Sequence, residues 1–167
     1  GTRSGKSRFA LEIAKKLKKV AFIATCLGLD KEMKSRIAYH KKSRPENWQT
    51  FEKPEDIPLL LEKIGTKFDL VIIDCLTLLV SDLLLKGLRE EAIENKINKI
   101  LAALKKIKSK SIIVSNEVGL GIVPKNKLAR DFRDIAGKIN QLVAKEADEV
   151  LFMVSGIATK IKEGEGG

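Results

Sequence analysis

Apolar residues gather in four short runs along the chain, and longer stretches between them carry apolar residues at helical spacing. The runs are rich in Val, Ile and Phe and lack strict alternation, which is typical of parallel strands covered on both faces. They are "KVAFIAT" (19–25), "DLVIID" (69–74), "SIIVSN" (111–116) and "DEVLFMVS" (148–155). We therefore predict four buried strands.

The stretches between these runs predict six helices. They cover residues 7–17, 30–42 (with Asp30 as N-cap), 54–64, 77–86, 90–107 and 124–147. The apolar face of the first is formed by Phe9, Ile13, Ala14 and Leu17. The apolar face of the last is formed by Leu128, Phe132, Ile135, Ile139 and Leu142.

The alternation of strands and helices predicts an α/β fold with an open, mostly parallel sheet and right-handed crossovers. The segment "GIATKIK" (156–162) is expected to return as a short edge hairpin. A chain of 167 residues fits one ordinary domain, and it shows no repeat or long linker. We therefore predict a single domain over residues 1–167.

The net charge of +10 permits either nucleic-acid binding or the binding of small anions. Lysines alternate with glutamates on the predicted helices and no aromatic residues are interleaved for base stacking, so we expect no nucleic-acid partner. The two cysteines match no metal or redox spacing and are expected to be reduced, as in a cytoplasmic protein. No apolar run approaches the roughly 20 residues of a membrane span.

The first seven residues, "GTRSGKS", match the second half of the phosphate-loop pattern G-x-x-x-x-G-K-[ST]. Gly5, Lys6 and Ser7 fill its last three positions, and its first glycine would lie one residue before Gly1. In such a loop, backbone N–H groups cradle phosphates, the lysine reaches the β- and γ-phosphates, and the serine hydroxyl ligates Mg²⁺. A phosphate loop needs a strand to launch it, so a first strand is expected before Gly1. The alternative is a glycine-serine turn before a basic helix.

With the strand pattern, this loop predicts a P-loop NTPase-like (RecA-like) sheet flanked by helices. The partner carboxylate of such a loop is expected at the end of a nearby strand, where Asp74 follows four apolar residues. Asp74 could hold Mg²⁺ directly or through water. It could equally cap the helix that is expected to begin near Thr77.

The only histidine, His40, lies in the basic stretch "SRIAYHKKSRP" (35–45). Arg36 and His40 are four residues apart and would share one face of a helix. Nearby cations lower the pKa of an imidazole, and a neutral imidazole can attack phosphorus while those cations hold phosphates. The residues alone favour the simpler interpretation of a surface histidine at a polar helix end.

Three further features have two interpretations each. "NEVGLGIVP" (116–124) follows a strand and places Asn116 and Glu117 where open α/β sheets bind ligands, or it forms a structural turn. "RDFRD" (130–134) contacts phosphate or a neighbouring subunit, or forms salt bridges on a solvated helix. Trp48 and Phe51 pack a base, or more simply a core or an interface.

Several long stretches together resemble one family, and the resemblance runs nearly end to end. They are "GTRSGKSRFA", "AFIATCLGLDKEMKSRIAYHKKSRPENWQTFE", "IIDCLTLLVSDLL", "VSNEVGLGIVPKNKLARDFRDIAGKINQLVAKEADEVLFMVSGI" and the final "KIK". This pattern resembles the bifunctional adenosylcobinamide kinase / adenosylcobinamide-phosphate guanylyltransferase family of cobalamin biosynthesis. The resemblance implies that a nucleoside triphosphate, ATP or GTP, phosphorylates adenosylcobinamide. GTP then guanylylates an enzyme histidine, and GMP passes to adenosylcobinamide phosphate to give adenosylcobinamide-GDP.

The resemblance also implies roles for individual residues. The guanylylated histidine matches His40, and Lys6 is the second residue expected to be catalytic. The nucleotide-binding positions match Gly1, Thr2, Arg3, Ser4, Gly5, Lys6, Ser7, Ala24, Thr25, Cys26, Lys41, Lys42, Ser43, Arg44, Glu52 and Asp74. Ser7 and Asp74 are the expected Mg²⁺ ligands, although Asp74 could instead accept hydrogen bonds from guanine. Subunits of the family associate into trimers, so a homo-oligomer is expected.

Two other functions remain open at this level. One is a small-molecule P-loop kinase that lacks nucleotidyl transfer, which would form no covalent GMP adduct. The other is a basic binding module for RNA, which would bind in a salt-sensitive manner and would be indifferent to Lys6→Ala.

Overall fold

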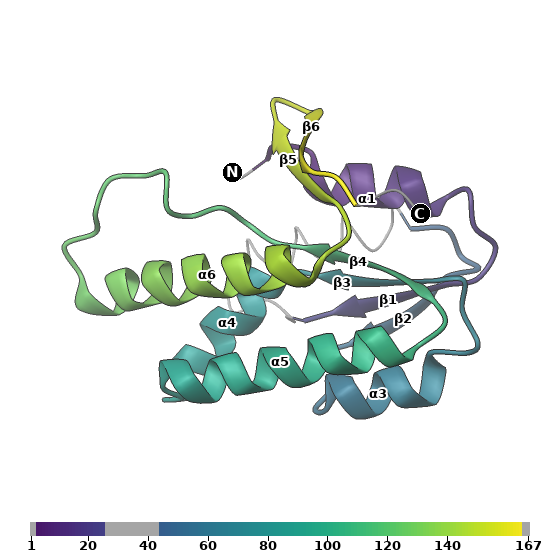
Figure 1. Ribbon diagram of the computed structural model, residues 1–167, viewed down its shortest axis with the longest axis horizontal. Coiled ribbons are helices and arrows are strands. Elements are labelled where there is room, and N and C mark those ends of the chain that lie inside the picture. The colour runs from purple at the N-terminus through teal and green to yellow at the C-terminus, as the bar shows by residue number, and fades with distance from the viewer. Residues whose placement is uncertain (1–2, 26–43, 165–167) are drawn as a thin grey trace.

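The computed structural model describes residues 3–25 and 44–164. Four parallel strands form the main sheet in the order β2-β1-β3-β4 (Figure 1). Their bounds are β1 Val20–Ala24, β2 Gln49–Glu52, β3 Leu70–Asp74 and β4 Lys110–Val114. All four run in the same direction, so their carboxyl ends share one edge of the sheet. This edge is called the carboxyl edge below.

Helices cover both faces of this sheet (Figure 1). The helix α1 (Lys6–Ala14) packs on one face, in a cluster with Phe22, Trp48 and Ile72. The other face is covered by α3 (Ile57–Ile64), α5 (Glu90–Lys106) and α6 (Lys127–Glu146), and α4 (Leu76–Leu85) follows β3 at the carboxyl edge. Successive strand residues alternate between the two clusters, which confirms the prediction of an α/β sheet buried on both sides.

The helices begin and end where local chemistry satisfies their backbone groups. Asp56 caps α3 by accepting a hydrogen bond of 2.9 Å from the Leu59 N–H, and a proline occupies the first turn. Asn126 caps α6 in the same way, through the Ala129 N–H at 3.3 Å. In α5, acidic residues lie in the first turn and lysines in the last, which favours both ends of the helix dipole.

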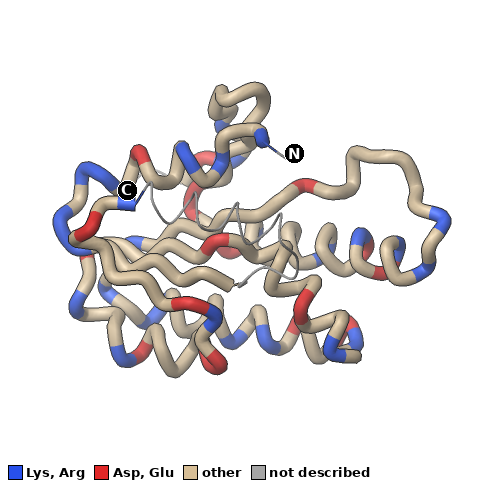
Figure 2. Tube along the Cα trace, turned by 180° about the vertical axis from the view of Figure 1, so that it is seen from behind, with Lys and Arg blue, Asp and Glu red and all other residues tan. Residues whose placement is uncertain are grey.

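Positively and negatively charged residues are interspersed along the helices (Figure 2). Between α5 and α6, Lys105 pairs with Glu146 and Lys138 with Glu90. Most of these side chains are substantially exposed, so such pairs orient the helices more than they stabilise them.

The predicted fourth strand does not join the parallel sheet. β5 (Val150–Val154) pairs antiparallel with β6 (Ile157–Lys162) in a separate two-stranded sheet beside α1 (Figure 1). Only Met153 of β5 is buried, so the expectation of a parallel strand covered on both faces was wrong at this position. The expected hairpin over 156–162 is confirmed as the return strand β6.

Three smaller predictions also need correction. The sequence reading missed β2, because this edge strand is short and polar and only Phe51 marks it. The last helix begins at Lys127 instead of Pro124, because Asn126 provides the cap. The first helix buries Ala10, Leu11 and Ala14, whereas Ile13 is 39% exposed.

Two parts of the sequence prediction are not tested by the described residues. The helix expected over residues 30–42 lies outside them, and so does the strand expected before Gly1. The single-domain assignment also stays a prediction. Of the described helices, none is long and apolar enough to cross a membrane.

Candidate functional site: the carboxyl edge and the phosphate loop

The segment before α1 has the backbone shape that the phosphate-loop motif requires. Gly5 has a φ of 92° and Arg3 a φ of 56°, so the chain turns through left-handed conformations directly before the helix. A Cβ on Gly5 would lie 3.2 Å from the Gly156 Cα, and the Gly156 N–H donates to the Ser4 carbonyl at 3.1 Å. The β5–β6 turn therefore packs closely against the loop and shapes it.

Lys6 is the first residue of α1 and is half-buried. Its Nζ donates to the Ser4 Oγ at 3.3 Å. Burial lowers the pKa of Lys6, and the nearby Cys75 and Asp74 oppose that shift. Lys6 thus lies close enough to the end of β3 for the charge of Asp74 to act on it. Ser7 follows it in the first turn of α1.

Two of the predicted carboxylates lie in one row at the carboxyl edge. Ala24 of β1 is in register with Glu52 of β2 on one side and with Asp74 of β3 on the other. Aligned residues of parallel strands project from the same face of a sheet. The row therefore extends from the exposed Glu52 to the half-buried Asp74, on the face that α1 covers.

Arg44 lies over the same face, at Phe22 and Thr50, which precede Ala24 and Glu52 by two residues in their strands. Its guanidinium carbon is 3.6 Å from the centroid of the Phe22 ring, and its Nη1 donates to the Thr50 hydroxyl at 3.3 Å. Burial lowers the pKa of Arg44, and the charges of Asp74 and Glu52 oppose this. Among the described residues, the buried Nε of Arg44 has no hydrogen-bond partner.

The ends of β1 and β3 are joined by one side chain. The Thr25 hydroxyl donates to the Cys75 carbonyl at 2.7 Å and accepts from the Cys75 N–H at 3.0 Å. The Thr25 N–H also donates to the Asp74 carbonyl at 3.2 Å. Thr25 is buried, so its side chain fixes the backbone after Asp74. The N-cap of α4 is Cys75, which removes the alternative that Asp74 caps this helix.

A polar network that the sequence analysis did not identify joins β4 to two helices. The Ser115 hydroxyl donates to the Asn140 Oδ1 at 2.6 Å, and the Asn140 Nδ2 donates to the Asn116 carbonyl at 3.1 Å. The Asn116 N–H donates to the Thr77 hydroxyl at 2.6 Å. The signal that could have located it was Asn140, a polar residue next to the apolar face of the last predicted helix.

A second cluster was also missed. Lys53 and Lys86 pair with the two oxygens of Asp82 at 2.9 and 2.8 Å. They line a cavity of about 330 Å³ that Thr25 also borders. The sequence carried no signal for it, because Lys53 and Asp82 belong to different elements and meet only in the fold.

The structure thus brings together the predicted site residues Arg3, Ser4, Gly5, Lys6, Ser7, Ala24, Thr25, Arg44, Glu52 and Asp74 around the carboxyl edge. The predicted residues Gly1, Thr2, Cys26, His40, Lys41, Lys42 and Ser43 lie outside the described residues. Trp48 and Phe51 have the simpler of the two roles considered for them, because both pack against other apolar residues of the protein. Trp48 is buried under α1, and Phe51 packs edge-on against Phe68 at 6.3 Å.

The donor chemistry near the loop suits a hard cation. Asp74 and Ser7 offer a carboxylate and a hydroxyl, and Mg²⁺ prefers oxygen ligands together with water and phosphate oxygens. The described residues contain no group of three or more potential His, Cys, Asp or Glu ligands. Of the described residues, Ser7 and Asp74 would therefore be the ones to hold such a cation.

A phosphate loop before a helix, a carboxylate at the end of β3 whose charge acts on the loop lysine, and a parallel sheet define a nucleotide-binding α/β protein of the P-loop class. Comparison with known proteins gives the family. Residues 1–161 match the family described as cobinamide kinase / cobinamide phosphate guanyltransferase, and the chain belongs to it.

Curated relatives agree with this assignment. The chain is 41% identical to the bifunctional adenosylcobalamin biosynthesis protein CobU of Salmonella typhimurium, over 97% of this chain and 96% of the relative. It is 40% identical to CobU of Escherichia coli over the same shares, and 36% identical to CobP of Pseudomonas aeruginosa over 97% and 94%. The protein is therefore a transferase of cobalamin biosynthesis, with the kinase and guanylyltransferase activities of its family.

Proposed function

We propose that both reactions take place at the carboxyl edge, and that His40 carries the guanylyl group between GTP and adenosylcobinamide phosphate. The observation that supports this most is the placement of Arg44. It lies four residues after His40 and is held over Phe22, where the charges of Asp74 and Glu52 act on it. Asp74 also acts on Lys6 of the phosphate loop. Arg44, four residues after His40 in the chain, therefore lies at the edge at which a triphosphate would bind.

In the kinase step, Lys6 and the backbone N–H groups of the phosphate loop hold the β- and γ-phosphates of a nucleoside triphosphate. The hydroxyl oxygen of adenosylcobinamide attacks the γ-phosphorus. The bond between that phosphorus and the bridging oxygen breaks, and the hydroxyl proton is lost. The nucleoside diphosphate leaves. The cationic Lys6 stabilises the charge that develops on the phosphate oxygens.

In the guanylyl step, a neutral His40 nitrogen attacks the α-phosphorus of GTP, and pyrophosphate leaves. A phosphate oxygen of adenosylcobinamide phosphate then attacks the same phosphorus. The bond to the imidazole breaks, and adenosylcobinamide-GDP leaves. The cations Lys41, Lys42 and Arg44 would hold phosphates and keep the imidazole neutral by lowering its pKa.

Ser7 and Asp74 are proposed to hold Mg²⁺, which would offset the negative charge of the triphosphate. The half-buried position of Asp74 opposite Lys6 supports this role. The same carboxylate could instead accept hydrogen bonds from the N1–H and N2–H₂ groups of guanine. A GTP titration of Asp74→Asn with and without Mg²⁺ separates the two roles. If Asp74 binds guanine, the variant should lose guanine selectivity. If Asp74 binds Mg²⁺, the variant should lose its dependence on the metal.

Three further parts of the proposal follow the family resemblance. The chain forms one catalytic domain over residues 1–167, it assembles as a homo-oligomer such as a trimer, and it works in the cytoplasm without a nucleic-acid partner. The free, buried thiol of Cys75 fits a reducing compartment. Light scattering on the purified protein tests the oligomeric state.

The guanylyl intermediate is tested by incubating the protein with α-labelled GTP and Mg²⁺. We expect label on the protein that is acid-labile and alkali-stable, as a phosphoramidate requires. His40→Ala should abolish it, whereas the exposed control Lys16→Ala should keep it. Label retained by His40→Ala would refute the assignment of His40. Phosphoryl transfer to adenosylcobinamide without any label on the wild-type protein would instead support a kinase that lacks the second activity.

A further inference from the structure

The loop between β4 and α6 exposes three large apolar side chains, and two of them, Leu120 and Ile122, are the most exposed large apolar residues among those described. Leu120 is 81% exposed, Ile122 96% and Val123 59%. We call these three side chains the aliphatic tip. Exposing aliphatic side chains to water is unfavourable, so a contiguous group of them on a loop calls for a ligand or partner.

Both ends of this loop are fixed, although its tip is exposed. At the start, Asn140 of α6 accepts from Ser115 and donates to the Asn116 carbonyl. At the end, the Arg130 guanidinium donates to the carbonyls of Pro124 at 3.1 Å and Lys125 at 2.5 Å. Hydrogen bonds at both ends hold the loop in place along α6, so the aliphatic tip has a defined position.

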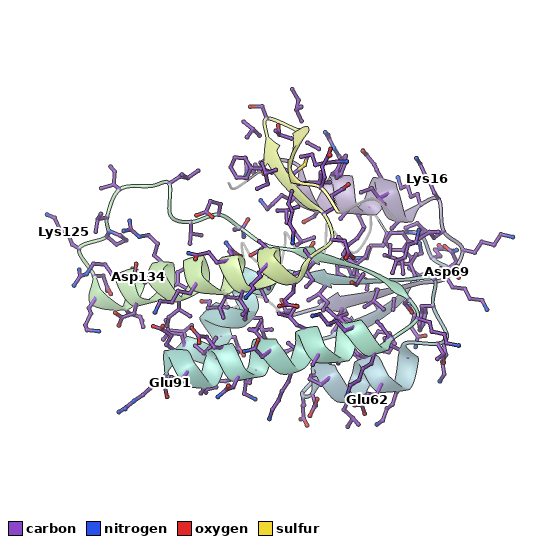
Figure 3. All side chains as sticks on the ribbon, in the orientation of Figure 1. Lys16, Glu62, Asp69, Glu91, Lys125 and Asp134 are labelled. Atoms are coloured by element: carbon purple, nitrogen blue, oxygen red, sulfur yellow. The ribbon has the colours of Figure 1, made fainter. Side chains whose placement is uncertain are left out.

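The loop that carries the tip starts at the reaction edge and extends outward from it. The loop leaves β4 at the carboxyl edge, where the Asn116 N–H donates to Thr77 of α4 and the Asn116 Nδ2 lies 4.0 Å from the Cys75 Sγ. Cys75 follows Asp74 directly. In two opposite views the loop extends beyond the carboxyl ends of the strands (Figures 1 and 2). Lys125 at its end lies across the molecule from Asp69, which precedes β3 (Figure 3).

We propose that the aliphatic tip is the docking surface for the corrin ring of the cobinamide substrate, an inference that rests on the proposed function. A corrin ring is a broad macrocycle whose rim carries methyl groups and amide-bearing side chains. Aliphatic side chains match the methyl groups, and a loop backbone can pair with amides. A Cβ on Gly121 would meet no atom within 4 Å, so the backbone there is open to close approach.

The kinase reaction also constrains where the corrin ring can lie. The ring must stay outside the phosphate-binding edge while the arm that bears the reacting hydroxyl reaches the nucleotide. A loop that starts at Asn116, beside Cys75, and carries the aliphatic tip outward from the sheet allows this. If a second copy of the chain covered the tip instead, variants of the tip would change the oligomeric mass and leave the affinity for the corrinoid unchanged.

The test compares Leu120→Ser/Ile122→Ser with the control Ile161→Ser, which removes an isoleucine that is 64% exposed on β6. For the double variant, the KM for adenosylcobinamide in the kinase reaction should rise about tenfold or more, because the lost apolar contact no longer favours binding. The KM for the nucleotide and the guanylylation of the protein by α-labelled GTP should not change. Equilibrium dialysis with adenosylcobinamide, followed by its colour, should show the same loss of affinity. Ile122→Leu should retain wild-type binding.

Three results would overturn the inference. One is a double variant that binds adenosylcobinamide as the wild type does. Another is an equal loss of affinity in Ile161→Ser. The third is a changed oligomeric mass with an unchanged KM for the corrinoid, which would make the loop an interface between copies. These results leave the proposed function intact, since that function fails only if the wild-type protein neither phosphorylates adenosylcobinamide nor accepts GMP.

Discussion

At the scale of the residue, Asp74 links the two halves of the proposed site. Its charge acts on Lys6 of the phosphate loop and on Arg44, which follows the histidine segment. Burial lowers the pKa of both cations, and the charge of the carboxylate opposes this shift in each case. Removing Asp74 would leave two desolvated cations near each other, at a cost in stability as well as in activity.

Thr25 is predicted to have a structural role, because its hydroxyl both donates to the Cys75 carbonyl and accepts from the Cys75 N–H. Thr25→Val leaves the buried Cys75 N–H without its acceptor, which costs about 2 kcal/mol of unfolding free energy. Thr25→Ser keeps the hydroxyl and should lose much less. Urea denaturation of both variants measures the difference, and equal stabilities would show that the hydroxyl is dispensable.

The thiol of Cys75 is predicted to be unreactive in the native protein. Burial, with the neighbouring charge of Asp74, raises its pKa from 9.0 to about 11. At pH 8 only about one thousandth of the native thiol is ionised, and the thiolate is the reactive form. Alkylation by iodoacetamide, followed by peptide mapping to separate Cys75 from Cys26, should be slow in the native protein and fast in urea.

The same shift has a consequence for stability. The folded pKa lies above the unfolded one, so the contribution of this thiol is complete below pH 9 and is lost as the pH rises toward 11. The free energy of unfolding should be lower at pH 10 than at pH 8, and this difference should be smaller in Cys75→Ala than in the wild type. Native labelling at pH 8 that is as fast as labelling in urea would contradict the assigned burial.

At the scale of the element, helix bounds could be predicted better than strand membership. The termini of α3, α4 and α5 lie within three residues of the sequence predictions, because the spacing of apolar residues is a local signal. By contrast, β2 carries only Phe51 as an apolar signal. The apolar sequence of β5 predicts a strand of the central sheet, although β5 pairs with β6 in a separate sheet. Which strand pairs with which depends on contacts between distant segments that a local pattern does not contain.

The cap of α3 provides a local test. Asp56→Ala removes the acceptor for the Leu59 N–H and should lower the free energy of unfolding by about 1 kcal/mol. Asp56→Asn retains a capping side chain and should lose only a small part of this. Both values come from chemical denaturation at neutral pH. A loss in Asp56→Asn equal to that in Asp56→Ala would point to the charge of Asp56 instead of its hydrogen bond.

At the scale of the whole molecule, the parallel sheet collects segments that are far apart in the chain. The phosphate loop, the end of β1, Arg44 and Asp74 meet at one edge because all four strands run in the same direction. The loop after β4 begins at that edge as well. The nucleotide site and the proposed corrinoid surface therefore follow from the topology of the sheet.

Nucleotide binding should stabilise the whole molecule. A ligand that binds only the folded state at 100 times its Kd contributes about 2.7 kcal/mol, so GTP with Mg²⁺ should raise the melting temperature. Lys6→Ala should abolish most of this increase, and the exposed control Lys16→Ala should keep it. A full increase in Lys6→Ala would show that the phosphates bind elsewhere.

The sequence by itself determined the α/β class, the phosphate loop, the position of Asp74 at the end of a strand and the family, because each of these depends on the order and spacing of residues along the chain and not on contacts between distant segments. Only the tertiary structure decided that β5 leaves the parallel sheet, that Thr25 joins Cys75 and that Asn140 anchors the loop after β4. It also placed Arg44 over Phe22, within the influence of Glu52 and Asp74. These contacts join residues that are distant in sequence, and their geometry depends on strand order and register, which form only when the chain packs.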